Sequence, residues 1–417
     1  MKTRFFSLGL SLTLVTVAFA PKSQAETAIA YRPSQPLEIE FVSAADFYHR
    51  ANQLLNSQEY REALTAYEQA IALDADYYYA WWGKGYVLQE LGEYKEAIAA
   101  YDRAIAINNR DAKLWFAKGY ILYETQEYEA AVAAYDRAVA LKPDYAIAWY
   151  NRGTSFRQQK QYDLAVTSYD RALEIDPDDS GFWYSRANAL VMLDRYLEAI
   201  ESYQRAIELN PQDFTAWNRL GMVLQGQQLY AVAIEAYNQA LEIEPNLDSA
   251  WQNLGEALYH QEQYAEAIVA FDHITETQAH DVDLWTYRGD AFYYLAEYQQ
   301  AIDNYDRAIA INASDIYVWI YRGNAFGKLE QYDKALEAYD QAVAIDSQNA
   351  FAWFNRGLAL SRLGRYDEAI DSYDKGLAID PDNTQAIRQR QQTLKLKGRK
   401  YKRSVISFWL ERSTTIL

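Results

Sequence analysis

Apolar and polar positions follow a helical rhythm along most of the chain. Trp149, Gly153 and Phe156 succeed one another at intervals of four and three residues, which places them on one face of a helix. Ala165, Tyr169 and Ala172 repeat these intervals a few residues later. The pattern therefore predicts pairs of short amphipathic helices joined by tight turns.

This pair of helices recurs with a fixed period. Tryptophans recur at a constant spacing without an exception, at Trp81, Trp115, Trp149, Trp183, Trp217, Trp251, Trp285, Trp319 and Trp353. Phe47 holds the same slot one period earlier, and Gly follows four residues after the Trp except at Ala187. Because Gly inside a helix costs roughly 0.5–1 kcal/mol relative to Ala, its recurrence predicts a place where two backbones nearly touch.

The second helix of each pair has its own signature. Ala97 and Tyr101 follow Trp81, and the same two residue types stand at the same distances after every later Trp, with Phe271 as the exception. Five repeats then close with proline, which cannot continue a helix: Pro143, Pro177, Pro211, Pro245 and Pro381.

These motifs resemble the tetratricopeptide repeat, whose 34-residue pattern is W-x2-L-G-x2-Y…A-x3-F…P. The resemblance covers residues 44–383 as ten repeats without insertion or deletion. It implies an all-α fold, a right-handed superhelical solenoid of ten helix-turn-helix repeats in which each helix pair buries its apolar face against its neighbours. Members of the family bind other proteins or peptides in a concave groove lined by the first helices.

The segment before the repeats is expected to direct export. A basic start and an apolar run over residues 5–20 are typical of a signal peptide, and the run is short for a membrane span. We expect cleavage after Ala25, with residues 26–43 as a linker, and a bacterial protein in the periplasm, secreted, or in a thylakoid lumen. The alternative is an anchor in the inner membrane through an uncleaved signal.

The segment after the repeats is basic. Residues 384–403 are expected to form a cap helix, because Ile387, Gln391 and Leu394 hold the slots of Trp, Gly and the next apolar residue. For the tail, residues 404–417, three interpretations stay open: packing on the cap, a frayed end, or a basic-aromatic contact with a membrane surface.

Charge is distributed unevenly between these segments. The formal net charge is −18, of which residues 1–25 contribute +3 and residues 384–417 contribute +8, so −29 remains for residues 26–383. A body of this charge repels phosphate backbones, which argues against nucleic acid as a partner.

The sequence contains no signature of catalysis. It has no Cys, no phosphate-binding Gly loop and no nucleophile elbow. His260, His273 and His280 share one repeat, but their register places them at a helix end, on an outer face and in a loop, which favours solvated imidazoles over a metal site. We therefore predict no catalytic residue, no cofactor and no metal.

The resemblance implies that the slots one, five and eight residues after the Trp face the groove. Aromatic side chains hold many of them: Trp82, Tyr86, Phe116, Tyr120, Tyr123, Tyr150, Tyr184, Tyr259, Tyr293 and Phe354. We interpret these rings as two patches that bind extended segments of partner proteins; the alternative is that neighbouring first helices pack them together. Because the slots are mostly without Lys, the clamp that some family members use for a terminal carboxylate is not expected.

A charge pattern links consecutive repeats. The residue three after the Trp is basic except at Leu220 and Leu254, and the residue 16 before each basic one is acidic, whereas both Leu follow neutral amides. We therefore predict ion pairs from the second helix of one repeat to the first helix of the next. The predicted pairs are Glu68–Lys84, Asp102–Lys118, Asp136–Arg152, Asp170–Arg186, Asp272–Arg288, Asp306–Arg322, Asp340–Arg356 and, into the cap, Asp374–Arg390.

The repeat over residues 248–281 departs most from the pattern. Phe271, Ile274 and Ala279 replace the usual Tyr, Ala and Pro. Ile274 adds bulk where a small residue lets helices approach, so we predict a change of pitch or a weak seam here.

These observations favour a non-catalytic scaffold or assembly factor that binds partner protein segments. The alternative is an accessory subunit of a separate enzyme of envelope polysaccharide or cell-wall assembly. The sequence does not predict an oligomeric state.

Overall fold

The computed structural model describes residues 43–274 and 280–414, and over residues 403–414 it describes only the course of a helix. This part of the chain contains 21 α-helices and no strand. In chain order they are α1 (Ala44–Asn56), α2 (Tyr60–Leu73), α3 (Tyr78–Glu90), α4 (Tyr94–Ile107), α5 (Ala112–Glu124), α6 (Tyr128–Leu141), α7 (Ala146–Gln158), α8 (Tyr162–Ile175), α9 (Ser180–Val191), α10 (Tyr196–Leu209), α11 (Phe214–Gly226), α12 (Tyr230–Ile243), α13 (Asp248–His260), α14 (Tyr264–Asp272), α15 (Val282–Tyr294), α16 (Tyr298–Ile311), α17 (Ile316–Lys328), α18 (Tyr332–Ile345), α19 (Ala350–Arg362), α20 (Tyr366–Ile379) and α21 (Thr384–Thr414).

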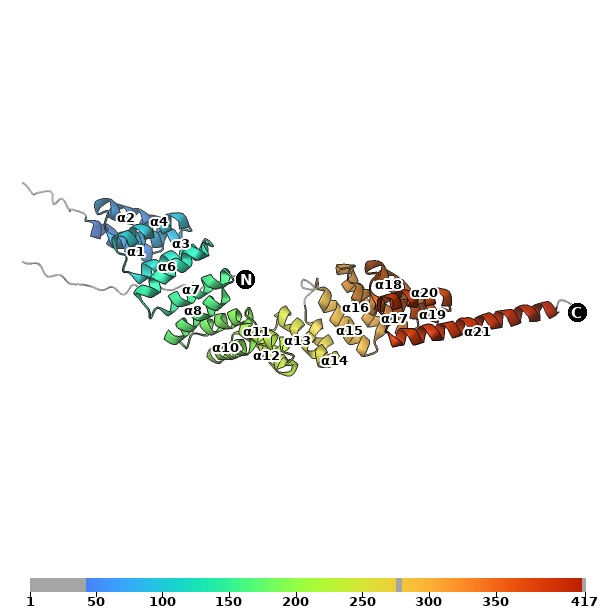
Figure 1. Cartoon of the computed structure of the whole chain (residues 1–417). Coiled ribbons are helices and arrows are strands. Elements are labelled where there is room, and N and C mark those ends of the chain that lie inside the picture. Colours follow the sequence, from blue (N-terminus) through green and yellow to red (C-terminus); the bar gives the residue numbers. More distant parts are fainter. Residues whose placement is uncertain (1–42, 275–279, 415–417) are drawn as a thin grey trace, which may run out of the picture.

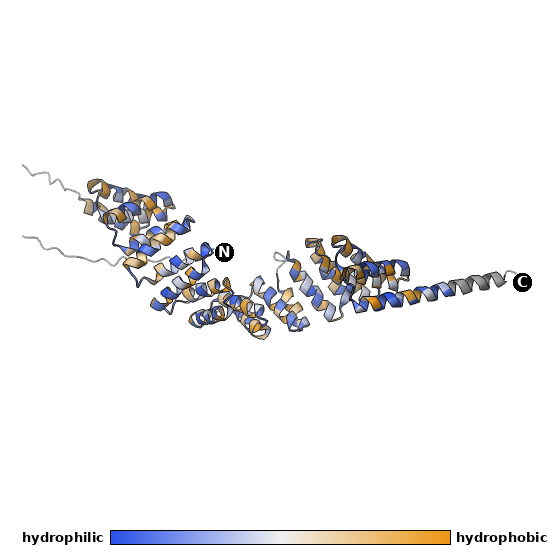
Figure 2. Ribbon diagram, in the orientation of Figure 1, coloured by the Kyte–Doolittle hydropathy of each residue, from blue (hydrophilic) through white to orange (hydrophobic). Residues whose placement is uncertain are grey.

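The helices form ten consecutive pairs in an elongated, curved row (Figure 1). Odd-numbered helices are the first helices and even-numbered helices the second helices of each pair. Apolar residues are spread over every pair and not gathered in one central core (Figure 2), as expected where each pair buries its face against its neighbours. The predicted all-α solenoid is confirmed.

Each second helix inserts an aromatic ring, nearly always of tyrosine, into its own repeat. Tyr101 is fully buried, and a Cβ built on Gly85 would lie 2.6 Å from its ring. The recurring Gly therefore makes room for an aromatic ring. The expectation of two backbones in near contact is confirmed only in part: at Gly153 a Cβ would also lie 3.1 Å from the backbone carbonyl oxygen of Ala165 in the second helix, but the nearest atoms at each of these glycines belong to the ring.

The recurring Trp fixes the loop that enters its repeat. The indole N–H of Trp149 donates to the backbone carbonyl of Pro143 at 3.0 Å, six residues earlier. The same bond forms in seven further repeats, for example from Trp319 to Ala313 at 2.9 Å. Because this bond ties the first helix to the loop before it, the Trp slot does more than fill the core.

The turn within each repeat contains one residue with positive φ. Eight of these ten residues are not glycine, among them Lys160 at +59° and Ala296 at +62°, and the other two are Gly92 and Gly364. The residue that follows returns its N–H to the first helix, as Glu93 does to Leu88 at 2.8 Å. This left-handed helix end sets the angle at which the second helix packs back.

All eight predicted ion pairs are present between consecutive repeats. In the pair that spans α6 and α7, Arg152 Nε lies 2.6 Å from Asp136 Oδ1. The others are Lys84–Glu68, Lys118–Asp102, Arg186–Asp170, Arg288–Asp272, Arg322–Asp306, Arg356–Asp340 and Arg390–Asp374. We call this series the ladder, and each pair a rung.

The structure adds a second contact that the sequence pattern did not suggest. Arg152 Nη1 donates to Ser168 Oγ at 2.8 Å, further along the same repeat. Arg186, Arg288 and Arg356 make the equivalent bonds to Ser202, Asn304 and Ser372. Alanine holds this slot behind both Lys, both Leu and Arg322 of the series, so a polar acceptor follows only some of the arginines.

The C-terminal helix differs from its prediction. A cap helix over 384–403 and a separate tail over 404–417 were expected, but α21 runs without a break from Thr384 to Thr414. No proline follows Pro381, and nothing else in the sequence ends the helix at residue 403. Its first half caps the array, since Ala386 is buried and Thr393 bonds Ser361 at 3.0 Å.

Two further points concern the ends and the seam. The predicted signal peptide, residues 1–25, and nearly all of the linker, residues 26–43, lie outside the described residues.

In the repeat that departs from the pattern, α14 has 9 residues where every other second helix has 14. Among the described residues, no helix combines the length and apolar character that crossing a membrane requires.

Candidate partner-binding face

Nine of the ten predicted groove aromatics are half-buried. The prediction is wrong for the tenth, Phe354, which is buried. Phe354 is 7% exposed and belongs to the core. Its ring fills the space beside Gly376, where a Cβ would lie 2.4 Å from it. Gly376 replaces the Ala of other repeats, so the larger neighbour sinks into the gap and cannot bind a partner.

Three of the other rings contribute to packing between helices. Phe116, Tyr150 and Tyr184 each contact the buried Tyr of their own second helix, with ring centroids 5.6–5.8 Å apart. Tyr150 also stacks on Phe182 of the next repeat at 4.8 Å. At these three slots the rings therefore pack between helices, which is the alternative to partner binding that the sequence left open.

The aromatic slots of α3 and α5 keep part of their rings on the surface. Trp82, Tyr86, Tyr120 and Tyr123 are all half-buried, and burial raises the pKa of Tyr86 and of Tyr120. Tyr123 accepts a hydrogen bond of 2.9 Å from Gln158, one repeat further on. These phenols stay neutral at physiological pH and offer flat apolar surface with a polar edge.

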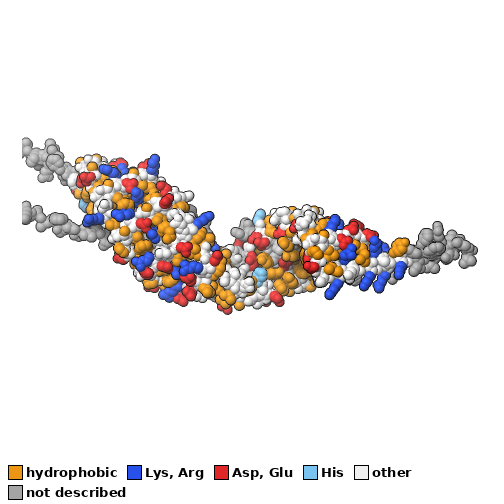
Figure 3. Space-filling model, viewed as in Figure 1, with side chains coloured by type: hydrophobic (Ala, Val, Ile, Leu, Met, Phe, Trp, Pro, Cys, Tyr) orange, Lys and Arg blue, Asp and Glu red, His pale blue; other side chains and the backbone are white. Residues whose placement is uncertain are grey.

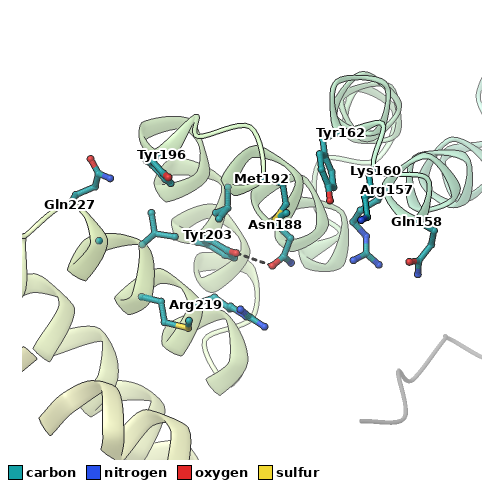
Figure 4. A pocket seen from close by; sticks show the side chains of 14 residues that line it. Arg157, Gln158, Lys160, Tyr162, Asn188, Met192, Tyr196, Tyr203, Arg219 and Gln227 are labelled. Carbon is teal, nitrogen blue, oxygen red and sulfur yellow. Dashed lines mark hydrogen bonds between the residues drawn. The ribbon is translucent and has the colours of Figure 1, made fainter. Parts of the chain in front are cut away.

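Next to this aromatic surface lies a hollow of about 540 Å³, which we call the central hollow. It opens between the C-terminal ends of α7, α9 and α11 and the second helices α8 and α10 (Figure 4). Met192 and Met222, which are 57% and 41% exposed, supply flexible apolar surface. Asn188 lines it and accepts from the buried Tyr203 at 2.9 Å. A hollow of this size suits a few side chains of a bound segment.

The charge of the central hollow is opposite to that of the body. Arg157, Lys160 and Arg219 line it, and none of its lining residues is acidic. Over the described ranges, none of these three cations forms an ion pair. This cluster does not follow from the repeat pattern, because only Arg157 comes from a groove-facing slot. Lys160 belongs to a turn, and Arg219 follows Trp217 by two residues.

Further along the same face the lining becomes acidic and rich in tyrosine. Asp290 of α15 accepts hydrogen bonds from Tyr305 at 2.6 Å and from Tyr259 at 3.5 Å. Burial raises the pKa of Asp290 to about 6, and the two phenol hydrogen bonds oppose this rise. The ring of Tyr259 contacts that of Tyr287 edge to face at 5.2 Å.

A second carboxylate lies close to this cluster. Glu256 accepts from Gln225 at 3.3 Å and from Gln252 at 3.2 Å. Burial raises its pKa as well, and Asp281 and Asp283 add to the rise. The face therefore changes along the row from cationic, at α7–α11, to anionic, at α13–α15.

Several exposed rings were missed by the sequence analysis. Tyr79, Tyr317 and Phe351 are each more than half exposed and stand two residues before the Trp of their repeats. Tyr294, 58% exposed, stacks on Tyr264 at 4.8 Å. A helical wheel that included the slots two before and nine after the Trp would have identified them.

The three histidines of one repeat have separate surroundings. His260 stacks on Tyr230 at 5.1 Å, and His273 stacks on Trp251 at 4.0 Å. His280 lies in the loop before α15. The part of the chain that the structure describes holds no cluster of His, Cys, Asp and Glu with the arrangement of a metal site.

Comparisons with known proteins give matches to one kind of repeat. A family model described as tetratricopeptide repeat matches residues 48–112, 116–180, 184–248 and 321–384, and a second model of the same description matches 224–290. No curated protein matches the chain.

The chain is also similar, at low sequence identity, to several solved structures. The MamA protein is 24% identical over 39% of this chain and 88% of its own, with a TM-score of 0.38. YrrB, a protein with "an unusual peptide-binding site", is 23% identical over 52% of this chain and 95% of its own, with a TM-score of 0.35. The P58(IPK) repeat domain is 15% identical over 86% of this chain and 99% of its own, with a TM-score of 0.35.

Proposed function

The chain belongs to the tetratricopeptide repeat family, and from this membership and the geometry of its first-helix face we propose that it is a non-catalytic scaffold that binds an extended segment of a partner protein. The central hollow carries this proposal. Three cations without ion-pair partners among the described residues surround exposed apolar surface there, on a body whose net charge is strongly negative. We infer that the bound segment has an acidic residue next to an apolar one.

The order of charges along the face suggests how the segment lies. A carboxylate of the segment would meet Arg157 or Arg219, and its apolar neighbour would lie against Met192 and Met222. A basic residue about three repeats further on would meet the acidic cluster at Asp290. Complementary charge of this kind fixes register and orientation more than it adds affinity.

The test is a selection of binding peptides followed by charge reversal. We expect peptides selected from a random library on the full chain to be enriched in Asp or Glu beside an apolar residue. The variant Arg157→Glu with Arg219→Glu should weaken their binding at least about tenfold. The matched control is Lys95→Glu with Lys113→Glu, which changes the net charge equally at exposed sites away from the hollow. Equal loss in both variants, or no charge preference among the peptides, would refute the proposed site.

We also propose that the scaffold acts outside the cytoplasm. The basic start and the apolar run within residues 1–25 support this. The absence of Cys removes any dependence on the redox state of the compartment.

A further inference from the structure

The ladder is interrupted at Leu220, and the outer side of the array is hollowed there. Gln204, Leu220 and Asn238 all line a hollow of about 810 Å³ between α10, α11 and α12, which we call the outer hollow. It lies on the side of the second helices, away from the lining of the central hollow.

An intact rung shows what is missing at this position. The arm of Arg152 crosses between two second helices, since it bonds Asp136 of α6 at 2.6 Å and Ser168 of α8 at 2.8 Å. Its guanidinium also lies over the Trp149 ring at 5.4 Å. Leu220 is too short to make this crossing, and Gln204 and Ala236 offer no carboxylate or hydroxyl to it. The space that an arginine arm fills elsewhere is therefore open.

The lining of the outer hollow favours a cation attached to apolar groups. Glu208, Glu235 and Glu242 line it together with Trp217, Leu224 and Val232, and none of its lining residues is basic. Val232 is 49% exposed. Glu208 already has one partner, Arg205 at 2.8 Å, whereas Glu235 forms no ion pair with any residue that the structure describes.

The chain itself contains a segment with the complementary chemistry. Residues 384–417 have a net charge of +8, and "KYKRSVISFWLER" near their end combines basic and apolar side chains. Lys397 forms an ion pair with Asp367, and Lys400 donates to the Gly364 carbonyl at 3.2 Å. Tyr401 is 71% exposed, and Figure 3 shows Lys and Arg side chains gathered where α21 leaves the array.

This end of α21 extends away from its own repeats. Figure 1 shows α21 continuing past α19 and α20 at the C-terminal end of the row, whereas α10–α12 lie near the middle of the row. A short isolated helix is marginal in water, and α21 continues to Thr414, beyond the contacts that Lys397 and Lys400 make with the array, so docking on a surface would stabilise its end. The outer hollow of the same molecule is out of reach, but that of a second molecule is accessible.

We propose that the basic end of α21 docks in the outer hollow of a second copy of the chain. A Lys or Arg of α21 takes the place of the missing rung, with its stem against Trp217 and its charge near Glu235 and Glu242. The contact is head to tail and not self-complementary, so it joins copies into open rows or rings.

The test is sedimentation of the full chain at several protein and salt concentrations. We expect association that grows with protein concentration at low salt and weakens at high salt, because the contact depends on charge. Glu235→Lys with Glu242→Lys should weaken it at least tenfold, as should truncation after Lys402, which keeps the contacts of the cap described above. The control Glu174→Lys with Glu337→Lys changes the same repeat slots and the same net charge elsewhere, and should associate normally.

A second measurement identifies the contact directly. The native chain has no Cys, so mixing Val232→Cys with Ser407→Cys should give a disulfide-linked pair of chains on oxidation. A chain that stays monomeric, equal effects of the two charge-reversal variants, or no cross-link above that of Glu174→Cys with Ser407→Cys overturns the proposal. Binding of α21 to anionic phosphatidylserine vesicles without self-association also overturns it, in favour of a membrane contact.

Discussion

Arg152 Nε donates to Asp136 Oδ1 at 2.6 Å across the boundary between two repeats, and the Arg152 side chain is only 19% exposed. The pair therefore adds a directional polar contact to the apolar packing between α6 and α7. Its acidic partner is about half exposed, which screens the interaction.

We expect the two members of this rung to be coupled. Asp136→Gln and Arg152→Leu should each lower the unfolding midpoint, and the double variant, which copies the natural pair of Gln204 and Leu220, should lower it by less than the sum. The expected coupling is about 1 kcal/mol, between the values for exposed and buried pairs. A double-mutant cycle by urea unfolding measures it, and additive effects would contradict the prediction.

The turn residue Ala296 offers a stabilising substitution. Its φ of +62° is unfavourable for a residue with a Cβ and neutral for Gly. Ala296→Gly should raise stability by roughly 0.5–1 kcal/mol in thermal unfolding. The control Ala99→Gly, at an exposed position inside α4, should lower stability by a similar amount. Destabilisation by both variants would count against this account of the turn.

Asp290 should make stability depend on pH. Its folded pKa of about 6 exceeds the ordinary value of 3.8, so the folded state holds its proton more tightly, and stability falls as pH rises from about 4 to about 6. Asp290→Asn removes this loss, and it should stabilise the chain at pH 7.5 by on the order of 2 kcal/mol with little effect at pH 4. The next repeat already has an amide in this slot, where Tyr339 donates to Asn324 at 2.8 Å. Parallel pH profiles for the two proteins would be the contrary result.

The short helix α14 should open more easily than its equivalents. It ends at Asp272 after 9 residues, whereas α16 runs for 14, so it has fewer helical hydrogen bonds and less buried surface to lose. Hydrogen exchange at residues 267–272 should be at least about tenfold faster than at residues 301–306. Equal protection of the two segments would contradict the prediction of a weak seam in this repeat.

Export can be checked on the protein made in a bacterial host. We expect the mature chain to begin at Glu26 and to leave the cytoplasmic fraction, because the basic start and an apolar run that is short for a membrane span are typical of a cleaved signal peptide. N-terminal sequencing after cell fractionation gives the answer. A chain that retains residue 1 and sediments with membranes would favour the uncleaved anchor.

The fold and the ladder could be read from the sequence because both rest on strict periodicity. Because the register repeats without insertion or deletion, Asp136 and Arg152 can pair in only one way, from the second helix of one repeat to the first helix of the next. The structure contains this pair. The second acceptor, Ser168, was accessible to the same comparison, since polar residues hold its slot only behind arginine.

The candidate site was predicted less well because its geometry depends on deviations from the pattern. Phe354 sinks into the core only because Gly376 is small. The cations of the central hollow come from a helix, a turn and another helix, at positions that share no slot. The continuation of α21 to Thr414 could be inferred only from the absence of a stop signal after residue 403. Such an absence is weaker evidence for a helix boundary than a proline or a capping residue would be.

The rungs also determine which repeats are exchangeable units. Removal of residues 137–170 would bring Asp136 to the place of Asp170, at the spacing of a rung before Arg186, and the joint would close as before. Removal of residues 205–272 would instead set Gln204 before Arg288 and leave the guanidinium without its carboxylate. Removal of residues 171–272 would set Asp170 before Arg288 and restore a rung. The array can therefore gain or lose whole repeats where both ends of the change lie at intact rungs, whereas a change with only one end at the interrupted positions Leu220 and Leu254 joins incompatible ends.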